Sequence, residues 1–151
     1  MLQADFAVYD PDGQLVLIVE TKSKLDTSRR WATQMRRNIL AHRLLPNAPF
    51  LLLALPNRLY LWKKSGTMPG LVEPDYEVDA SPFFQPYYEK AQVSPQHLSG
   101  QSFALIVASW LNELLQGIQP ANLPDEAQKF LEESGLLEAL RGGSVAVAVP
   151  G

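Results

Sequence analysis

The stretch that decides the fold is DFAVYDPDGQLVLIVETKSK, residues 5 to 24. Its two halves, 4–10 and 14–22, are rich in β-branched and aliphatic residues, which is typical of strands. Between them the tetrapeptide DPDG at 10–13 has the chemistry of a tight turn, because proline fits the second turn position and glycine tolerates a positive φ. The sequence therefore predicts a β-hairpin. The apolar run LVLIV at 15–19 predicts that its second strand is covered on both faces.

Three charged residues of this hairpin form the first candidate site. Asp5 lies near the start of the first strand, and Glu20 and Lys22 lie late in the second. If Tyr9 pairs with Gln14, all three share one face of the sheet, because side-chain direction repeats every two residues. Asp5 and Glu20 are then diagonal neighbours, roughly 7–8 Å apart at the backbone, a gap that two carboxylates can close onto one ion.

The residue types indicate a hard metal ion. The chain has no cysteine, so a thiolate metal site is excluded, and with only two histidines we do not expect a histidine-rich one. Oxygen ligands from Asp5, Glu20 and the main-chain carbonyl of Thr21 suit Mg²⁺, with Mn²⁺ as an alternative. Lys22 would approach the attacking water and a scissile phosphate. Such a set neutralises phosphate charge and activates water, as phosphodiester hydrolysis requires.

The next segments extend the hairpin into an α/β fold. Residues 28–45 predict a helix that stops at Pro46, with Asp26, Thr27 or Ser28 as its N-cap. Two more strands are predicted at 48–55 and 58–62. We therefore expect an α/β core over residues 1–64, with a mixed central sheet of about four strands flanked by helices.

The rest of the chain predicts a strap and a helical extension. Residues 65–98 carry five prolines and four clustered aromatics, which favour a loop strapped onto the surface. Residues 99–151 predict an extension packed on the same domain, with a helix at 99–118 capped by Ser99. A second helix begins at Pro124 and is interrupted or bent at Gly135. The last stretch, SVAVAV at 144–149, predicts either an edge strand or a loose tail.

The charge distribution indicates a polyanionic ligand. Residues 22–64 hold ten Lys or Arg against one acid, although the whole chain has a formal net charge of −3. Five arginines lie in the predicted helix at 28–45 and are candidates for phosphate contacts. They are Arg29, Arg30, Arg36, Arg37 and Arg43. Phosphate contact and a merely solvated helix face are both compatible with this pattern, and DNA is the expected partner.

At this point the residues resemble the PD-(D/E)xK nucleases, which have a restriction-endonuclease-like fold. Asp5 matches the first acid of the motif, and Glu20-Thr21-Lys22 matches its ExK on the next strand. The resemblance covers about residues 4–62 and is greatest for the N-terminal nuclease domains of type I restriction motor subunits. It implies magnesium-dependent cleavage of DNA, with Asp5, Glu20 and Lys22 as the catalytic set.

The sequence departs from this family in three places. Ala4 replaces the proline of the motif. Members usually have a helix before the first strand, and because this sequence starts four residues before Asp5 we expect that helix to be missing. RecB-type members carry a Gln-x-x-x-Tyr pair on the following helix. Gln34 matches its glutamine and is a candidate catalytic residue, whereas Asn38 stands in place of the tyrosine.

Two other functional classes stay open. The same fold without catalysis would be a module that binds nucleic acid or a protein partner, and a plain structural or oligomerisation domain is a third reading. The sequence has no stretch that predicts a signal peptide or a membrane span, so we expect a cytoplasmic protein. A homodimer through the C-terminal helices is a further expectation.

Overall fold

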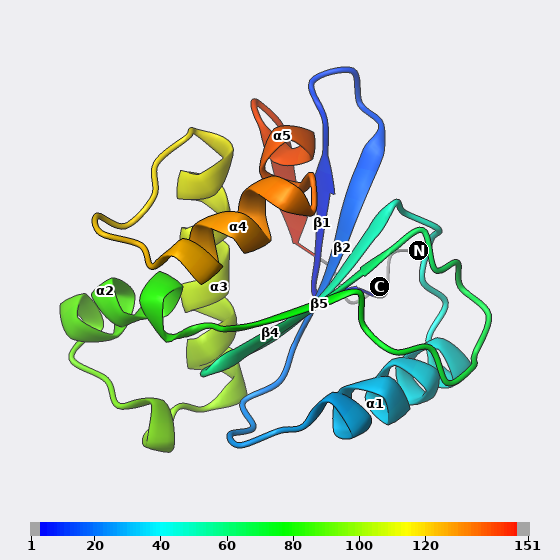
Figure 1. Cartoon of the computed structure of the whole chain (residues 1–151), viewed down its shortest axis with the longest axis horizontal. Helices are drawn as coiled ribbons and strands as arrows, with labels where there is room; N and C mark the ends of the chain where they lie inside the picture. Colours follow the sequence, from blue (N-terminus) through cyan, green and yellow to red (C-terminus); the bar gives the residue numbers. More distant parts are fainter. Residues whose placement is uncertain (1–3, 148–151) are drawn as a thin grey trace.

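A computed structural model describes residues 4 to 147 and contains a six-stranded sheet with helices on both faces (Figure 1). The strand order is β5-β4-β3-β2-β1-β6, with β2 and β3 parallel and the other neighbours antiparallel. The strands are β1 (Phe6–Tyr9), β2 (Leu15–Thr21), β3 (Phe50–Leu55), β4 (Arg58–Lys63), β5 (Tyr76–Asp79) and β6 (Ser144–Val147). The helices are α1 (Arg29–His42), α2 (Ser81–Ala91), the short 3-10 helix η1 (Pro95–His97), α3 (Gly100–Leu115), α4 (Asp125–Glu133) and α5 (Leu136–Leu140).

The predicted α/β class and mixed sheet are confirmed, but the predicted count of about four strands is wrong. The two additional strands are the edges of the sheet, β5 and β6. β5 comes from the segment predicted as a strap, and β6 pairs with β1 along its whole length. Both are four residues long, so their sequence pattern is short. The predicted alternative of an edge strand at 144–149 is thus confirmed for residues 144–147, and the remainder lies outside the described residues.

The segment 65–98 also holds a helix that the sequence analysis missed. α2 spans 11 residues, with Pro82 in its first turn and Pro86 inside it. A proline in the first turn costs little because that N–H has no partner within the helix. Pro86 removes one internal hydrogen bond, and the buried aromatic side chains of Phe83, Phe84 and Tyr88 hold the helix in place. Packing has therefore outweighed the local propensity that predicted a loop.

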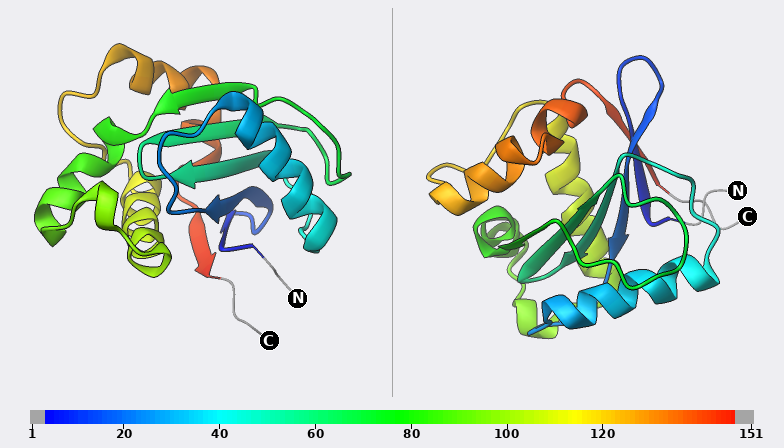
Figure 2. Two further views of the ribbon diagram at one scale, coloured as in Figure 1. Left: turned by 90° about the horizontal axis from the view of Figure 1, so that it is seen from below. Right: turned by 45° about the vertical axis from the view of Figure 1, so that its right-hand side comes forward.

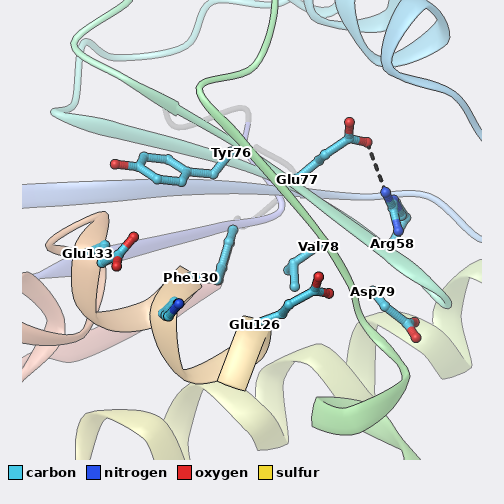
Figure 3. A pocket seen from close by; sticks show the side chains of 9 residues that line it. Arg58, Tyr76, Glu77, Val78, Asp79, Glu126, Phe130 and Glu133 are labelled. Atoms are coloured by element: carbon cyan, nitrogen blue, oxygen red, sulfur yellow. Dashed lines mark hydrogen bonds and ion pairs between the residues drawn. The ribbon is translucent and has the colours of Figure 1, made fainter. Parts of the chain in front are cut away.

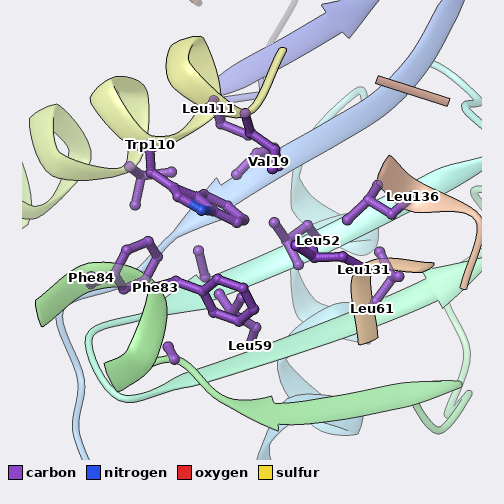
Figure 4. Close-up of a cluster of buried hydrophobic side chains, with 14 of the residues drawn as sticks. Val19, Leu52, Leu59, Leu61, Phe83, Phe84, Trp110, Leu111, Leu131 and Leu136 are labelled. Carbon is purple, nitrogen blue, oxygen red and sulfur yellow. The ribbon is translucent and has the colours of Figure 1, made fainter. Parts of the chain in front are cut away.

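The larger core lies between the sheet and helices α2 to α5 (Figure 4). Trp110 of α3 contacts Phe83 and Phe84 of α2 in this core, with ring centroids 5.6 and 5.4 Å apart. Odd-numbered β2 residues such as Val19 point into this layer. One side of α3 is thus buried in this core, whereas Ile118, which follows the helix, is 49% exposed.

The opposite face of the sheet carries α1, as Figures 1 and 2 show. Two smaller apolar clusters lie there, one under α1 and one around Ala7 and Ile18. The connection between β4 and β5 runs beside α1 and completes this layer (Figure 2). Ile18 of β2 lies in the second of these clusters, and Glu20, two residues further along the strand, points to the same face because side chains alternate along a strand.

The predicted turn and helix caps are confirmed. Gly13 has a φ of +83°, and its amide donates to the carbonyl of Asp10 at 2.9 Å. The hydroxyl of Ser28 caps α1 by accepting from the amide of Trp31, and Ser99 caps α3. α1 ends at His42, earlier than predicted, and Arg43 is its C-cap residue. A left-handed Gly135 separates α4 from α5, as predicted.

Candidate functional site

The register of the hairpin differs from the predicted one but keeps the two acids on one face. Tyr9 pairs with Leu15 and not with Gln14, and a bulge follows because Val8 pairs with Leu17. Each change shifts the register by one residue. Since two such shifts restore the direction of every side chain, the Asp5 and Glu20 side chains still point to the same face of the sheet.

The corrected register brings the two acids closer than predicted. Phe6 pairs with Val19, so continuing the pairing by one residue sets Asp5 directly opposite Glu20. The amide of Lys22 donates to Ala54 of β3 at 3.1 Å, which shows that even-numbered residues here direct their backbone groups toward β3. Asp5 and Glu20 are therefore a non-hydrogen-bonded pair, the arrangement in which Cβ atoms are roughly 4.5–5.5 Å apart.

Asp5 is fixed by the end of the neighbouring strand. Its Oδ2 accepts hydrogen bonds from the amide of Thr21 at 2.8 Å and from the Thr21 hydroxyl at 3.1 Å. Its carboxyl group also lies within hydrogen-bonding reach of the Glu20 carboxyl group. The hydrogen bonds from Thr21 thus hold the Asp5 side chain in place beside Glu20.

Glu20 is fully buried, at 0% exposure. Its Oε2 accepts a hydrogen bond from Nη1 of Arg43 at 2.6 Å, in an ion pair that links α1 to β2. Its Oε1 is buried and has no hydrogen-bond partner in the described part of the chain. A buried oxygen without a partner costs about 1–3 kcal/mol, which a proton or a cation would offset.

Burial and the second acid both make Glu20 hard to ionise. Its pKa is raised from 4.5 to about 8, foremost by loss of hydration and then by the negative charge of Asp5, with which its carboxyl group is in contact. The positive charge of Arg43 opposes this rise. At neutral pH the pair therefore holds a proton that a metal ion could replace.

Lys22 and Thr21 complete the hairpin end. Lys22 lies one strand repeat beyond Glu20, roughly 6–7 Å along the same face, and its side chain is partly exposed. No ion pair between described residues involves Lys22. The carbonyl of Thr21 points toward β1, because the amide of the same residue bonds to Asp5 and the two groups of a strand residue point the same way.

Gln34 does not join this set. It is exposed, and it is two residues away from Ala32, which is buried against the sheet. Two residues are about 200° of helix rotation, so Gln34 points away from the sheet on which the acids lie. Asn38 is exposed as well. Gln34 is therefore not placed beside the acid pair, and its predicted catalytic role stays a prediction.

The five arginines predicted to contact phosphate do not form a single exposed surface. Arg36 is 1% exposed, and it donates to the carbonyl oxygens of Gly70 at 3.2 Å and Ser65 at 3.0 Å. It fastens the β4–β5 connection to α1, and burial lowers the pKa of its guanidinium. Because its guanidinium does not reach solvent, Arg36 is not placed to make the phosphate contact that we predicted for it.

The other four arginines divide into two pairs. Arg29 donates to the Pro74 carbonyl at 2.6 Å and forms an ion pair with Glu77 at 3.4 Å, while Arg43 is bound to Glu20. Arg30 and Arg37 are exposed and form no ion pair with a described residue. Of the five predicted phosphate contacts, Arg30 and Arg37 therefore remain the most accessible.

No protein-family model, curated protein or solved structure matches this chain. Within residues 4–147 no group of three or more His, Cys, Asp or Glu side chains is placed to hold a metal ion. Asp5 and Glu20 are a pair of acids, so any ion there would also need the Thr21 carbonyl, water or a ligand oxygen. No helix of the described part is long and apolar enough to cross a membrane.

Two cavities among the described residues lie away from the acid pair. One of about 310 Å³ lies between β5 and α4 and is lined by both acidic and basic side chains, among which Arg58 binds Glu77 at 3.1 Å (Figure 3). Another, of about 420 Å³, lies between α2 and α3 beside Leu105, which is 66% exposed. Neither contains Asp5 or Glu20. The predicted homodimer through the C-terminal helices stays a prediction.

Arg43 is the residue of this site whose role the sequence analysis missed. It was assigned to nucleic acid together with the other arginines, but its guanidinium reaches a carboxylate that lies 23 residues earlier in the chain. One signal was present in the sequence. An acid that ends an apolar strand such as LVLIVE is buried, and a buried carboxylate needs a cation or a proton.

Proposed function

We propose that this protein hydrolyses phosphodiester bonds of nucleic acid, DNA above all, with the help of a divalent cation. The observation that carries the proposal is the pair of carboxyl groups of Asp5 and Glu20, which face each other on adjacent strands. One oxygen of the pair, Glu20 Oε1, is buried and unsatisfied. The order of hairpin, helix and parallel strand supports the resemblance to the PD-(D/E)xK fold.

The residues at this point fit a hard cation. Glu20 Oε1 has no donor among the described residues, the Asp5 carboxyl group lies beside it, and the Thr21 carbonyl points toward β1, the strand that leads from Asp5. All three are the oxygen ligands that Mg²⁺ and Mn²⁺ prefer. The raised pKa of Glu20 also supports the fit, because a cation relieves the repulsion between two carboxylates.

Each residue has a distinct task in this proposal. When bound, Mg²⁺ supplies a positive charge that polarises a phosphoryl oxygen and makes a bound water more acidic. Asp5, held by Thr21, and Glu20 keep their carboxylates at fixed positions. Lys22 has no ion-pair partner in the described part of the chain, so its ammonium group can hold the attacking water or stabilise charge that develops on the phosphate.

Exposed positive charges support nucleic acid as the substrate class. Arg30 and Arg37 are seven residues apart, and therefore lie on one side of α1, and Lys24 is exposed in the connection that leads from Lys22 to this helix. The chain as a whole is acidic, with a formal net charge of −3, so this local concentration of basic residues is a feature of the α1 region. A negatively charged backbone is the ligand that such a region favours.

Cleavage of plasmid and single-stranded DNA tests the proposal. The wild-type protein should convert both substrates in Mg²⁺ or Mn²⁺, and an excess of chelator should stop the reaction because Asp5 and Glu20 alone cannot activate water. Products should be followed on denaturing gels over time. Absence of cleavage on both substrates, with either metal and over a range of salt concentrations, would contradict the proposal.

A second candidate is a nuclease-like module that binds nucleic acid or a protein partner without cutting. The ion pair between Arg43 and Glu20, at 2.6 Å, favours it because a guanidinium already neutralises the buried acid. DNA binding that weakens with salt, is indifferent to Mg²⁺ and is never followed by cleavage would support this candidate over catalysis.

A further inference from the structure

Arg43 is a partly exposed residue that binds the buried acid Glu20. Its side chain is 34% exposed, whereas Glu20, which it binds at 2.6 Å, is 0% exposed. It is also the C-cap residue of α1, with an extended backbone (φ −130°, ψ 146°). The guanidinium thus reaches the buried carboxylate on a long aliphatic stem from the C-terminal end of α1.

The positive charge of Arg43 already neutralises part of the negative charge of the two acids. Asp5 and Glu20 together can carry two negative charges, and Arg43 contributes one permanent positive charge. A divalent cation at the pair would neutralise both carboxylates and would then repel a guanidinium a few ångströms away. At such distances the interaction between charges is large even when partly screened by solvent.

We infer that Arg43 is a built-in counter-cation that competes with the divalent ion for Glu20. In the absence of metal it holds the buried carboxylate in place, and metal binding requires it to release Glu20 and turn toward solvent. Arg43 is therefore a positioning residue that sets the metal concentration at which the site fills. This inference rests on the proposed function, because it takes the Asp5–Glu20 pair to be the cation site.

Neutralising Arg43 should consequently strengthen metal binding. The proton on Glu20 also competes with metal and also gains when Arg43 is removed, but a proton carries half the charge of Mn²⁺ and therefore gains less. We expect Arg43→Gln to lower the Kd for Mn²⁺ by about tenfold or more. Arg43→Lys, which keeps the charge, should stay near the wild-type Kd.

Calorimetric titration of the chelator-treated full chain with MnCl₂ at pH 8 measures these affinities. Arg141→Gln is the matched control, since it removes the same charge from an exposed residue that follows α5, on the opposite side of the sheet from the acid pair, and its Kd for Mn²⁺ should match the wild type. Thermal melting gives a second readout: saturating Mn²⁺ should raise the Tm of Arg43→Gln by more than that of the wild type, because the metal replaces a lost partner of Glu20.

The outcomes separate this inference from the proposed function. If wild type and Arg43→Gln bind Mn²⁺ with the same Kd, or if Arg43→Lys binds as tightly as Arg43→Gln, competition by the Arg43 charge is wrong while the metal site stands. If neither protein binds Mn²⁺, both ideas fall. Tight Mn²⁺ binding that is sensitive to Arg43, in a protein that cuts no DNA, would support the inference and contradict catalysis.

Discussion

A Glu20→Gln protein should cut DNA at least about a hundredfold more slowly than the wild type, while folding normally. Glutamine has the shape of the protonated glutamate, so it fills the buried position and can still accept from Arg43. It lacks the negative charge that would hold a divalent cation beside Asp5. The rate of plasmid cleavage under saturating Mg²⁺ is the measurement, with thermal melting as the check on folding.

Glu132→Gln is the matched control for this substitution. Glu132 is an exposed residue of α4, a helix that packs on the opposite side of the sheet from the acid pair. The same chemical change at that position should leave the cleavage rate unaltered. A folded Glu20→Gln protein that cuts as fast as the Glu132→Gln protein would show that the buried glutamate takes no part in the reaction.

The stability of the wild type should fall as the pH rises from about 4.5 to about 8, by an amount traceable to Glu20. The folded protein raises the pKa of Glu20 to about 8, from 4.5, so in this window the folded state keeps a proton that the unfolded state has lost. Stability is therefore fully present below pH 4.5 and declines until the folded form also ionises near pH 8. The integrated loss is on the order of 4 kcal/mol.

Urea unfolding of the chelator-treated protein at several pH values from 4.5 to 9 measures this loss. Other groups titrate as well, so the informative quantity is the free energy of unfolding of wild type minus that of Glu20→Gln. That difference should become more negative with pH, because glutamine does not ionise, and Mn²⁺ should restore part of the wild-type stability at pH 8 to 9. Parallel profiles for the two proteins would contradict the burial of an ionisable carboxyl group.

The hairpin shows why the candidate site was accessible from sequence. The tetrapeptide DPDG at 10–13 identified the turn, and the period of two along each strand placed Asp5 and Glu20 on one face. The predicted register was wrong by two residues, since pairing near the turn and the bulge before Leu17 each shift it by one. The prediction that Asp5 and Glu20 share a face stayed correct only because two shifts of one residue restore the direction of each side chain. No local pattern in the sequence predicts that bulge.

The arginines show what sequence periodicity leaves open. The sequence places five arginines in or next to one helix, but helix periodicity does not say whether a given side of the helix faces solvent or protein. Arginine is rarely buried, so an exposed stripe was the natural expectation. Instead, two of the arginines bind partners that are distant in the sequence. Arg36 binds backbone carbonyls of the β4–β5 connection, and Arg43 binds Glu20.

For a related reason, the edge strand β5 could not be predicted from the sequence. YEVD at 76–79 is a four-residue strand between prolines, and its pairing partner is β4, more than a dozen residues earlier in the chain. Similarly, Pro82 and Pro86 argued against a helix whose stability comes from Phe83, Phe84 and Tyr88 in the core. In both segments tertiary packing outweighed local propensity.

The most direct test of the cation site is an anomalous difference map from a crystal of the wild-type protein soaked in MnCl₂ at pH 8. We expect a peak within roughly 3 Å of both Glu20 Oε1 and a carboxylate oxygen of Asp5, with the Arg43 guanidinium withdrawn from Glu20. A map without a peak at this pair, in a crystal where Arg43 remains bound to Glu20 at saturating Mn²⁺, would contradict this expectation.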